Sequence, residues 1–264
     1  IARGGKRLGI YFLENGSSVR PSSVVYDRAD SSITKAAPYE FDLDEIFKDA
    51  DLFHVSGITP VLSEEAKELT LAALKKAKEH HVTVSFDLNY RSKLWTSDIE
   101  GKQKMLSEMM EYVDICFGNA RDAAKCLGYT GAGIDFIDGE YNICVDEEHM
   151  RNVLNHYHFT HLITTLRNSI SASDNGWSGA VCTSDDYYKG RDYMLHIVDR
   201  VGGGDSFASG FLHGILADMG SRKALEFGLA AAAIKHTIPG DLNYITESEV
   251  LSMIESDGAG RVQR

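Results

Sequence analysis

The amino-acid sequence predicts an α/β fold with a mainly parallel central sheet and helices on both of its faces. From residue 41 onward, segments with the apolar period of a helix alternate with short runs of β-branched residues. The connections between them are short, which favours parallel pairing of strands beneath covering helices. A length of 264 residues and a hydrophobic share of 43% suffice for one large core.

The first predicted element is a β-hairpin or a pair of strands. Residues 7–16 and 23–28 are rich in Ile, Val, Tyr and Phe. The stretch NGSSVRPSS that joins them carries turn residues. We therefore expect a small β-structure ahead of the α/β alternation.

The alternation begins with predicted helices and strands that follow one another closely. A helix over residues 63–81 is predicted to start with a capping box at Ser63. The other predicted segments in this half are helices at 41–50, 100–113 and 120–128, and strands at 52–57, 82–89 and 114–119. Ligands of such sheets bind beyond the carboxyl ends of the strands, so the residues after each strand are candidates for a site.

The second half continues with a predicted helix over residues 147–158 and a strand over 161–166. Residues 169–181 are rich in Ser, Asn and Gly, and we expect a mobile loop there. Helices are predicted at 205–220 and 223–236, with a frayed tail at 258–264. Small residues recur every four positions in the first of these helices and predict a close contact with the second; they are Ser206, Gly210 and Gly214.

Composition excludes several classes of function. The net charge of −12 argues against a nucleic-acid-binding surface. The sequence contains no uninterrupted apolar window of about 18 residues, so no membrane span is expected. The histidines form no zinc motif. The cysteines at 116, 126, 144 and 182 lack the spacing of a disulfide scaffold, which predicts reduced thiols and a cytoplasmic location.

Three consecutive glycines precede a single carboxylate at the start of a predicted helix. Gly202, Gly203 and Gly204 can direct main-chain N–H groups toward one point at the positive end of the helix dipole, which predicts an anion hole. Asp205 follows them, and it either caps the helix or accepts a proton beside that hole. The run does not match a dinucleotide fingerprint, and no Walker loop occurs in the chain.

The run DRVGGGDSFASG at residues 199–210 resembles the second signature of the ribokinase-like (PfkB) carbohydrate kinases. The resemblance implies a three-layer α/β/α sandwich with a small β-sheet lid. We expect residues 1–30 to belong to the lid and residues 31–264 to form the core. The family uses ATP and Mg²⁺, with Asp205 in the place of the catalytic base and Gly202, Gly203 and Gly204 in the place of the anion hole.

The segments GIYFLENG, VVYDR and DLNYRSKLW resemble the 2-keto-3-deoxygluconate kinases of that family. By this resemblance Tyr11, Tyr26, Arg28 and Arg91 are predicted to bind the sugar acid. Arginine's planar fork suits a carboxylate. A solvated Arg28, a surface ion pair at Arg91 and ordinary strand tyrosines are the alternatives.

Other family positions are matched less closely. Asn119 and Asp122 replace an NxxE pattern that supports the metal, and the shorter Asp122 is expected to reach it only through water. Thr165 and Arg167 are predicted phosphate or ribose contacts. His236 falls where the family lines the adenine pocket, although a helix C-terminal cap explains it equally. The family's amino-terminal signature is absent, so we expect a segment that precedes Ile1.

The resemblance therefore predicts phosphorylation of the 6-hydroxyl of 2-keto-3-deoxygluconate, a small sugar acid, and self-association through the lid. Two alternatives stay open at this point. One is a kinase for a neutral sugar such as fructose or ribose, and the other is a sugar- or nucleotide-sensing module without catalysis. A nicotinamide dehydrogenase is a more distant alternative.

Overall fold

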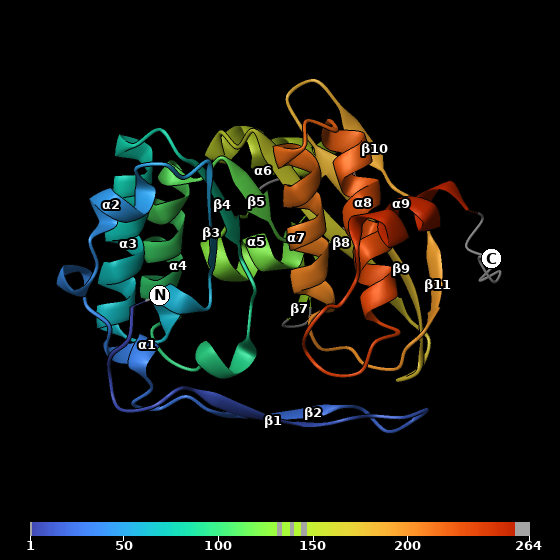
Figure 1. The fold of residues 1–264 in the computed structure, drawn as a ribbon, viewed down its shortest axis with the longest axis horizontal. Coiled ribbons are helices and arrows are strands. Elements are labelled where there is room, and N and C mark those ends of the chain that lie inside the picture. The colour runs from blue at the N-terminus through green and yellow to red at the C-terminus, as the bar shows by residue number, and fades with distance from the viewer. Residues whose placement is uncertain (1, 131–133, 138–139, 144–146, 257–264) are drawn as a thin grey trace. The chain divides into compact units, whose positions relative to one another are not determined.

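The computed structural model describes residues 2–130, 134–137, 140–143 and 147–256 (Figure 1). The chain divides into two compact units. The first unit comprises Ile1–Phe12, Val24–Thr164 and Cys182–Asp186, and the second comprises Leu13–Ser23, Thr165–Val181 and Tyr187–Arg264.

A central seven-stranded sheet confirms the predicted α/β class. Its strands run in the order β10-β9-β8-β5-β4-β3, and β11 pairs with β9. The pairs β3–β4, β4–β5 and β5–β8 are parallel, whereas β11 is antiparallel to β9. The bounds are β3 (Leu52–Ser56), β4 (Thr83–Asp87), β5 (Ile115–Phe117), β8 (His161–Ser169), β9 (Asp174–Cys182), β10 (Tyr187–Lys189) and β11 (Tyr193–His196).

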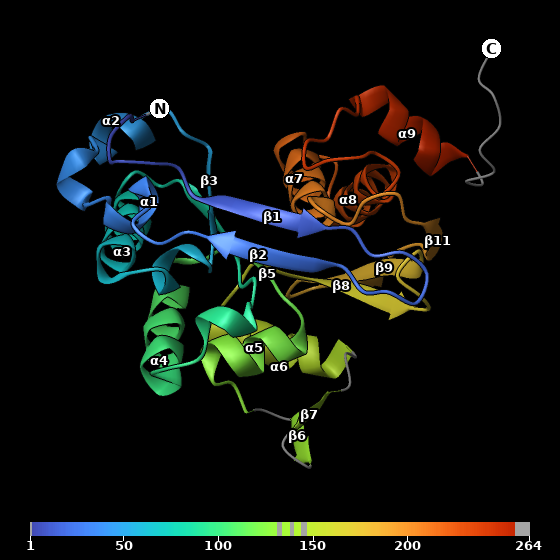
Figure 2. The ribbon, with the colours of Figure 1, turned by 90° about the horizontal axis from the view of Figure 1, so that it is seen from below.

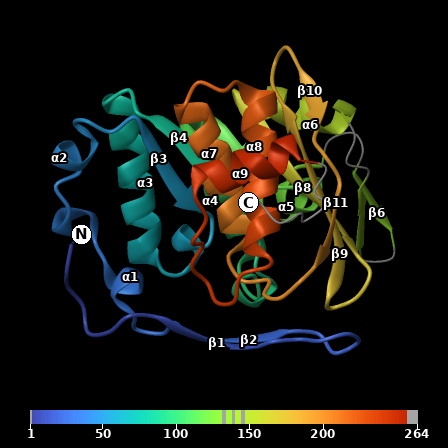
Figure 3. The same cartoon turned by 45° about the vertical axis from the view of Figure 1, so that its right-hand side comes forward.

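The helices of the first unit lie where the apolar period predicts them, except for a short helix at 32–35 that was not predicted. They are α1 (Ser32–Lys35), α2 (Leu43–Phe47), α3 (Glu64–Glu79), α4 (Ile99–Met109), α5 (Ala120–Leu127) and α6 (Glu147–Tyr157), with short 3₁₀ turns at Pro38–Glu40, Thr59–Val61, Ser92–Leu94 and Met110–Tyr112. Helix α3 contacts β4 (Figure 3) and buries Ala66, Leu74 and Ala77 completely, since these residues share one face. A pair of short strands, β6 (Ile134–Ile137) and β7 (Glu140–Ile143), was not predicted.

The predicted capping box of α3 is only half formed. The Ser63 hydroxyl accepts a hydrogen bond from the Ala66 N–H at 3.1 Å, which confirms Ser63 as the N-cap. The reciprocal bond is absent because Ala66 occupies the third helical position and has no side-chain acceptor. The prediction of a full capping box was therefore wrong in its reciprocal hydrogen bond.

The second unit contains α7 (Gly203–Leu216), α8 (Ser221–Lys235) and α9 (Glu247–Glu255). Helices α7 and α8 lie side by side (Figures 1 and 3). A Cβ atom on Gly210 would lie 2.9 Å from the Cα of Gly228, and one on Gly214 would lie 2.6 Å from the Cα of Ala224. The predicted close contact of these helices is confirmed, and glycine is required where the backbones meet.

The predicted mobile loop at residues 169–181 was wrong for most of its length. Strand β8 extends to Ser169, and strand β9 begins at Asp174. Only residues 170–173 turn between them, and both Ile170 and Ser171 donate their N–H groups to the Asp174 carbonyl. The sequence reads as a loop because Ser, Asn and Gly have low strand propensity, whereas pairing and burial within the sheet decide the structure.

The predicted amino-terminal β-structure is confirmed as a two-stranded ribbon of β1 (Ile10–Glu14) and β2 (Ser23–Asp27) (Figure 2). In β2 the half-buried and exposed residues alternate, so Val24 and Tyr26 share one face. Arg28 continues this face just beyond the strand. Among the described residues, no helix is both long and apolar enough to cross a membrane.

Three of the four cysteines are buried and have free thiols: Cys116, Cys126 and Cys182. Cys144 lies outside the described residues. Burial raises the pKa of Cys116 well above its ordinary value and also raises the pKa values of Cys126 and Cys182. These thiols therefore stay protonated and inaccessible near neutral pH.

We expect iodoacetamide at about pH 8 to leave these three cysteines unmodified in the folded protein, because only an accessible thiolate reacts. Peptide mass spectrometry measures the labelling at each position, and protein labelled in denaturant is the control in which all cysteines react. Labelling of any of the three at the denatured rate would contradict the buried arrangement.

Candidate active site

The glycine run forms the start of α7, and each glycine has a different environment. Gly202 is the N-cap residue with φ of +78°, in the left-handed region that favours glycine. A Cβ on Gly203 would lie 2.5 Å from Cε1 of His236, so the imidazole packs directly against this glycine. A Cβ on Gly204 would meet nothing within 4 Å in the structure. The first two glycines are explained by the fold, and the third leaves its backbone open to a ligand.

Two main-chain donors at this helix end have no acceptor in the part of the chain that the structure describes. They are the N–H groups of Gly204 and Asp205, whereas the Gly203 N–H has a long contact of 3.5 Å to the Arg200 carbonyl. The Asp205 side chain is exposed, caps no backbone group, and forms no hydrogen bond to a described residue. The capping alternative for Asp205 is therefore wrong, and a carboxylate stands beside two unused donors.

Buried Asp199 fixes the loop that carries the glycines. Its Oδ1 accepts the Val201 N–H at 3.0 Å, and its Oδ2 accepts the Gly240 N–H at 2.9 Å. The N–H groups of Val198 and Asp199 both donate to the His236 carbonyl. The glycine run is thus held to the segment that follows α8 by hydrogen bonds on both sides.

The predicted nucleotide contacts are connected through an aromatic residue that sequence reasoning missed. The Arg167 guanidinium lies 4.9 Å from the ring centroid of Trp177, and the rings of Trp177 and His236 are 5.2 Å apart. His236 in turn packs against Gly203. Trp177 is 2% exposed and belongs to the strand that was predicted as a loop. Arg167 is exposed and Thr165 is half-buried, and both lie on β8.

His236 is buried, with 3% of its surface exposed, and its Nδ1 bonds the Ala232 carbonyl at 2.6 Å. It is the C-cap residue of α8, so the capping alternative is confirmed. Burial lowers the pKa of His236 below its ordinary value, and the nearby charge of Arg167 adds to this effect, while the bond to Ala232 opposes it. A neutral imidazole therefore packs beneath the glycine run.

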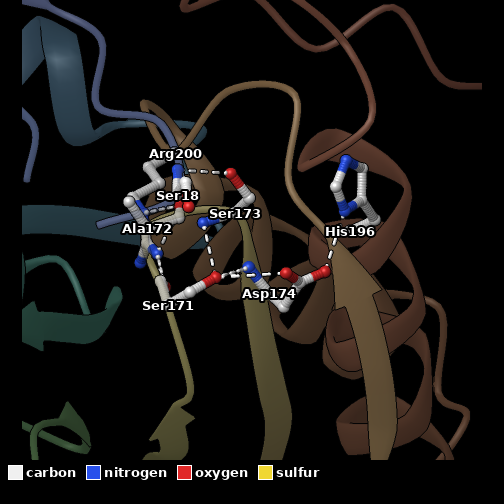
Figure 4. A network of polar contacts seen from close by, with 7 residues as sticks. All are labelled: Ser18, Ser171, Ala172, Ser173, Asp174, His196 and Arg200. Carbon is white, nitrogen blue, oxygen red and sulfur yellow. Dashed lines mark hydrogen bonds and ion pairs between the residues drawn. The ribbon is translucent and has the colours of Figure 1, made fainter. Parts of the chain in front are cut away.

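Arg200, which replaces the family's usual threonine, organises the turn between β8 and β9 (Figure 4). Its Nη2 donates to the carbonyls of Ser171 and Ala172 at 2.9 and 2.8 Å. The same turn holds the ribbon tip, because Ala172 donates to the Ser18 carbonyl at 2.8 Å and the Ser18 N–H donates to Ser173 Oγ at 3.0 Å. The guanidinium of Arg200 is engaged by backbone groups rather than directed toward a ligand.

Asp174 completes this network at the start of β9 (Figure 4). Its carboxylate accepts from Ser171 Oγ at 3.1 Å and contacts Nδ1 of His196 at 2.8 Å. These hydrogen bonds lower the pKa of the Asp174 carboxyl, with that of His196 contributing most. The exposed pair of Asp174 and His196 stabilises the turn between β8 and β9. In this turn Ser171 bonds Asp174, and Ser173 accepts the Ser18 N–H.

Two of the predicted sugar-binding residues of the ribbon, Tyr26 and Arg28, contact each other. The Arg28 guanidinium stacks over the Tyr26 ring at 4.0 Å from its centroid. Lys93 donates to the Val24 carbonyl at 2.9 Å and thereby ties β2 to the segment after β4 that contains Arg91. Tyr11 on β1 is partly exposed.

Arg91 itself is exposed, and its Nη1 donates a hydrogen bond to the neighbouring Tyr90 carbonyl at 3.1 Å. No ion pair of Arg91 with a carboxylate is formed among the described residues, so the surface ion-pair alternative is not supported. Most of its planar donor fork is available to a ligand.

Asn119 and Asp122 form a reciprocal capping box at the start of α5. Asn119 Oδ1 accepts the Asp122 N–H at 2.9 Å, and Asp122 Oδ2 accepts the Asn119 N–H at 3.2 Å. Burial raises the pKa of the Asp122 carboxyl, whereas the Asn119 N–H and the charge of Arg91 lower it. Both side chains thus have a structural role, and one Asp122 oxygen remains for a water-mediated contact.

The predicted site residues fall into two groups. Gly202, Gly203, Gly204, Asp205, Thr165, Arg167 and His236 belong to the second unit, and Tyr11, Tyr26, Arg28, Arg91, Asn119 and Asp122 belong to the first. Within the described residues, no three His, Cys, Asp or Glu side chains converge as a preformed metal site.

The chain is similar to sugar kinases over nearly its whole length. The family of pfkB carbohydrate kinases matches residues 1–246. A 2-dehydro-3-deoxygalactonokinase from Haloferax volcanii is 34% identical over 254 residues, which cover 96% of this chain and 72% of that protein. A 5-dehydro-2-deoxygluconokinase from Bacillus licheniformis is 28% identical, with 97% of this chain and 72% of that protein covered.

Among solved structures, a 2-dehydro-3-deoxygluconokinase from Thermotoga maritima superposes with a TM-score of 0.88 and 44% sequence identity. The match covers 97% of this chain and 75% of that chain. The predicted three-layer fold and the resemblance on which it was based are confirmed.

Proposed function

The chain belongs to the pfkB family of carbohydrate kinases, and from this premise we propose that it transfers the γ-phosphoryl group of ATP to the 6-hydroxyl of 2-keto-3-deoxygluconate. The observation that carries the proposal is the start of α7. There the unused N–H groups of Gly204 and Asp205 adjoin the Asp205 carboxylate, which has no hydrogen-bond partner among the described residues. An anion and a hydroxyl group are the ligands that this pair of features would bind.

In the proposed mechanism Asp205 accepts the proton of the 6-hydroxyl as its oxygen attacks the γ-phosphorus. The N–H groups of Gly204 and Asp205 stabilise the charge on the phosphoryl oxygens during transfer. The open space at Gly204 allows the phosphate to approach the main chain. ADP leaves, and the bond between the sugar oxygen and phosphorus replaces the bond between the β,γ-bridging oxygen and phosphorus.

Mg²⁺, when bound with ATP, would neutralise phosphate charge and orient the nucleotide. Asp122 is the residue of this chain that we propose near it, through water, because its Oδ2 is already bonded to the Asn119 N–H. Thr165 and Arg167 on β8 are proposed contacts of the nucleotide, with Arg167 oriented by Trp177. Closure of the ribbon over the bound sugar would exclude water and suppress hydrolysis of ATP.

The acid sugar is proposed from the available arginines. Arg91 keeps most of its donor fork free, and Arg28 is oriented by stacking on Tyr26. Two arginines suit the carboxylate of a sugar acid, whereas a neutral sugar requires neither. The names of similar proteins also refer to keto-deoxy sugar acids.

A coupled assay of ADP release over acidic and neutral sugars tests this proposal. We expect the highest kcat/KM with 2-keto-3-deoxygluconate or its galactonate epimer, and little turnover of fructose or ribose. Preference for a neutral sugar would favour the alternative kinase, and absence of sugar-dependent ADP release would favour a sensing module.

We also propose that the protein self-associates through the ribbon. The two strands of the ribbon and the residues just before them expose several apolar side chains, among them Leu8, Ile10, Phe12 and Val25, with 81%, 50%, 61% and 60% exposed surface. Apolar groups clustered on a small two-stranded sheet favour a contact with a second copy of the chain. A cytoplasmic location stays a prediction from the cysteine pattern.

Phe12→Asp is expected to shift the protein from dimer to monomer, because a carboxylate cannot be buried unpaired in an apolar interface. Sedimentation velocity over a dilution series measures the mass. Val19→Asp is the matched control, since Val19 is 96% exposed at the turn outside the two strands. A wild-type monomer, or equal loss of the dimer in both variants, would contradict the proposed interface.

A further inference from the structure

The last residue of α8, Lys235, is a charged group buried behind the glycine run. None of its surface is exposed. Its Nζ donates to the carbonyls of Ile238 and Gly240 at 3.1 and 2.7 Å. No carboxylate forms an ion pair with it in the part of the chain that the structure describes. A buried ammonium that is satisfied only by carbonyl dipoles is uncommon, because burial without a counter-ion is strongly unfavourable.

Lys235 lies next to the loop of the proposed anion hole. Its Cε would be 3.3 Å from a Cβ placed on Gly202, the residue that precedes α7. Gly240 connects Lys235 to Asp199, because its carbonyl accepts from Lys235 and its N–H donates to the Asp199 carboxylate at 2.9 Å. Asp199 then holds the Val201 N–H at 3.0 Å. The ammonium and the glycine run are therefore linked by a short series of hydrogen bonds.

A role in folding alone does not explain the charge. An apolar side chain of similar length would fill the same space at the end of an Ala-rich helix, without the cost of burying an ammonium. The positive charge also lowers the pKa of His236, although burial of that imidazole has the larger effect. The charge thus influences a residue that packs directly on Gly203.

We propose that Lys235 is an internal cation that positions the glycine run and adds positive potential where the γ-phosphate binds. This inference rests on the proposed function. The ammonium does not touch the substrate, so Lys235 is a positioning residue. Its positive charge strengthens the attraction between a bound phosphate and the two main-chain donors at Gly204 and Asp205. The Lys235 charge should therefore increase the affinity for a nucleotide with a γ-phosphate more than the affinity for a nucleotide without one.

The test compares nucleotides with and without the γ group. Titration calorimetry measures binding of Mg²⁺ with a non-hydrolysable ATP analogue and with ADP. Lys235→Met is expected to reduce the affinity for the ATP analogue about 10-fold more than the affinity for ADP. It is also expected to lower kcat on the order of 10-fold to 100-fold, with little change in KM for the sugar. Lys235→Gln keeps a donor without charge, and we expect the same loss.

Lys102→Met is the matched control, since Lys102 also donates to two backbone carbonyls, those of Leu94 and Ser97. In Lys102→Met, the ratio of the affinity for the ATP analogue to the affinity for ADP should equal that of the wild type. Equal weakening of both nucleotides by Lys235→Met would overturn the inference, as would wild-type turnover in Lys235→Gln. Loss of cooperative unfolding in both neutral variants would assign Lys235 to folding alone. Sugar-dependent ADP release by the wild type separately tests the proposed function.

Discussion

Asp205→Asn is expected to lower kcat by about 10²–10⁴-fold, the range for loss of a general base. The amide keeps the shape of the side chain but cannot accept the proton of the sugar hydroxyl. The Asp205 side chain forms no hydrogen bond to a described residue, so the variant should fold normally. Loss of a carboxylate at a helix N-terminus costs about 0.3–1 kcal/mol in the free energy of unfolding. Steady-state kinetics and thermal unfolding together separate the two effects.

Asp218→Asn is the matched control for this variant. Asp218 is an exposed aspartate just beyond the other end of α7, and its φ of 54° is one that asparagine also adopts. The kcat of Asp218→Asn should equal that of the wild type. Unchanged turnover in Asp205→Asn would remove the proposed base, and equal loss in both variants would indicate a general effect of the substitutions.

Arg91→Ala is expected to raise KM for the sugar acid by about 10-fold to 100-fold, which corresponds to loss of a charge-assisted hydrogen bond of roughly 1.5–3 kcal/mol. The KM for a neutral sugar such as fructose should change little, because no carboxylate is then bound. Arg28→Ala is expected to act in the same direction. Initial rates over a range of each sugar at saturating ATP measure the effect.

Arg20→Ala is the control for these arginine variants. Arg20 is a ribbon residue whose guanidinium already bonds Glu14 Oε1 at 2.6 Å and the Asn15 carbonyl at 2.9 Å. Its removal should leave KM for both sugars unchanged. A rise in KM of equal size for acidic and neutral sugars in Arg91→Ala would reject the carboxylate-anchor role and favour the neutral-sugar alternative.

Local patterns were sufficient to predict most of the fold. Apolar periodicity located the long helices, and the small residues Gly210 and Gly214 predicted a helix contact that the structure contains. Strand β9 was missed because its Ser, Asn and Gly residues are strand-like only through pairing with β8 and β11. Trp177 was missed with it, since a residue placed in a mobile loop is not expected to orient Arg167 and His236.

Some features of the site can also be predicted from local sequence, whereas others depend on tertiary contacts. The Asn-x-x-Asp spacing at Asn119 and Asp122 is a local signal for the capping box that the structure contains, and a search for N-caps would have found it. The packing of His236 on Gly203 and the burial of Lys235 depend on how α7 meets the end of α8. No spacing in the sequence encodes those contacts.

The most direct test is a crystal structure with ADP, Mg²⁺, aluminium fluoride and 2-keto-3-deoxygluconate. Aluminium fluoride occupies the place of the transferring phosphoryl group. We expect its fluorides about 3 Å from the N–H groups of Gly204 and Asp205, with an Asp205 carboxylate oxygen accepting a hydrogen bond from the 6-hydroxyl. A complex in which the fluoride is held elsewhere and Asp205 points away from the sugar would contradict it.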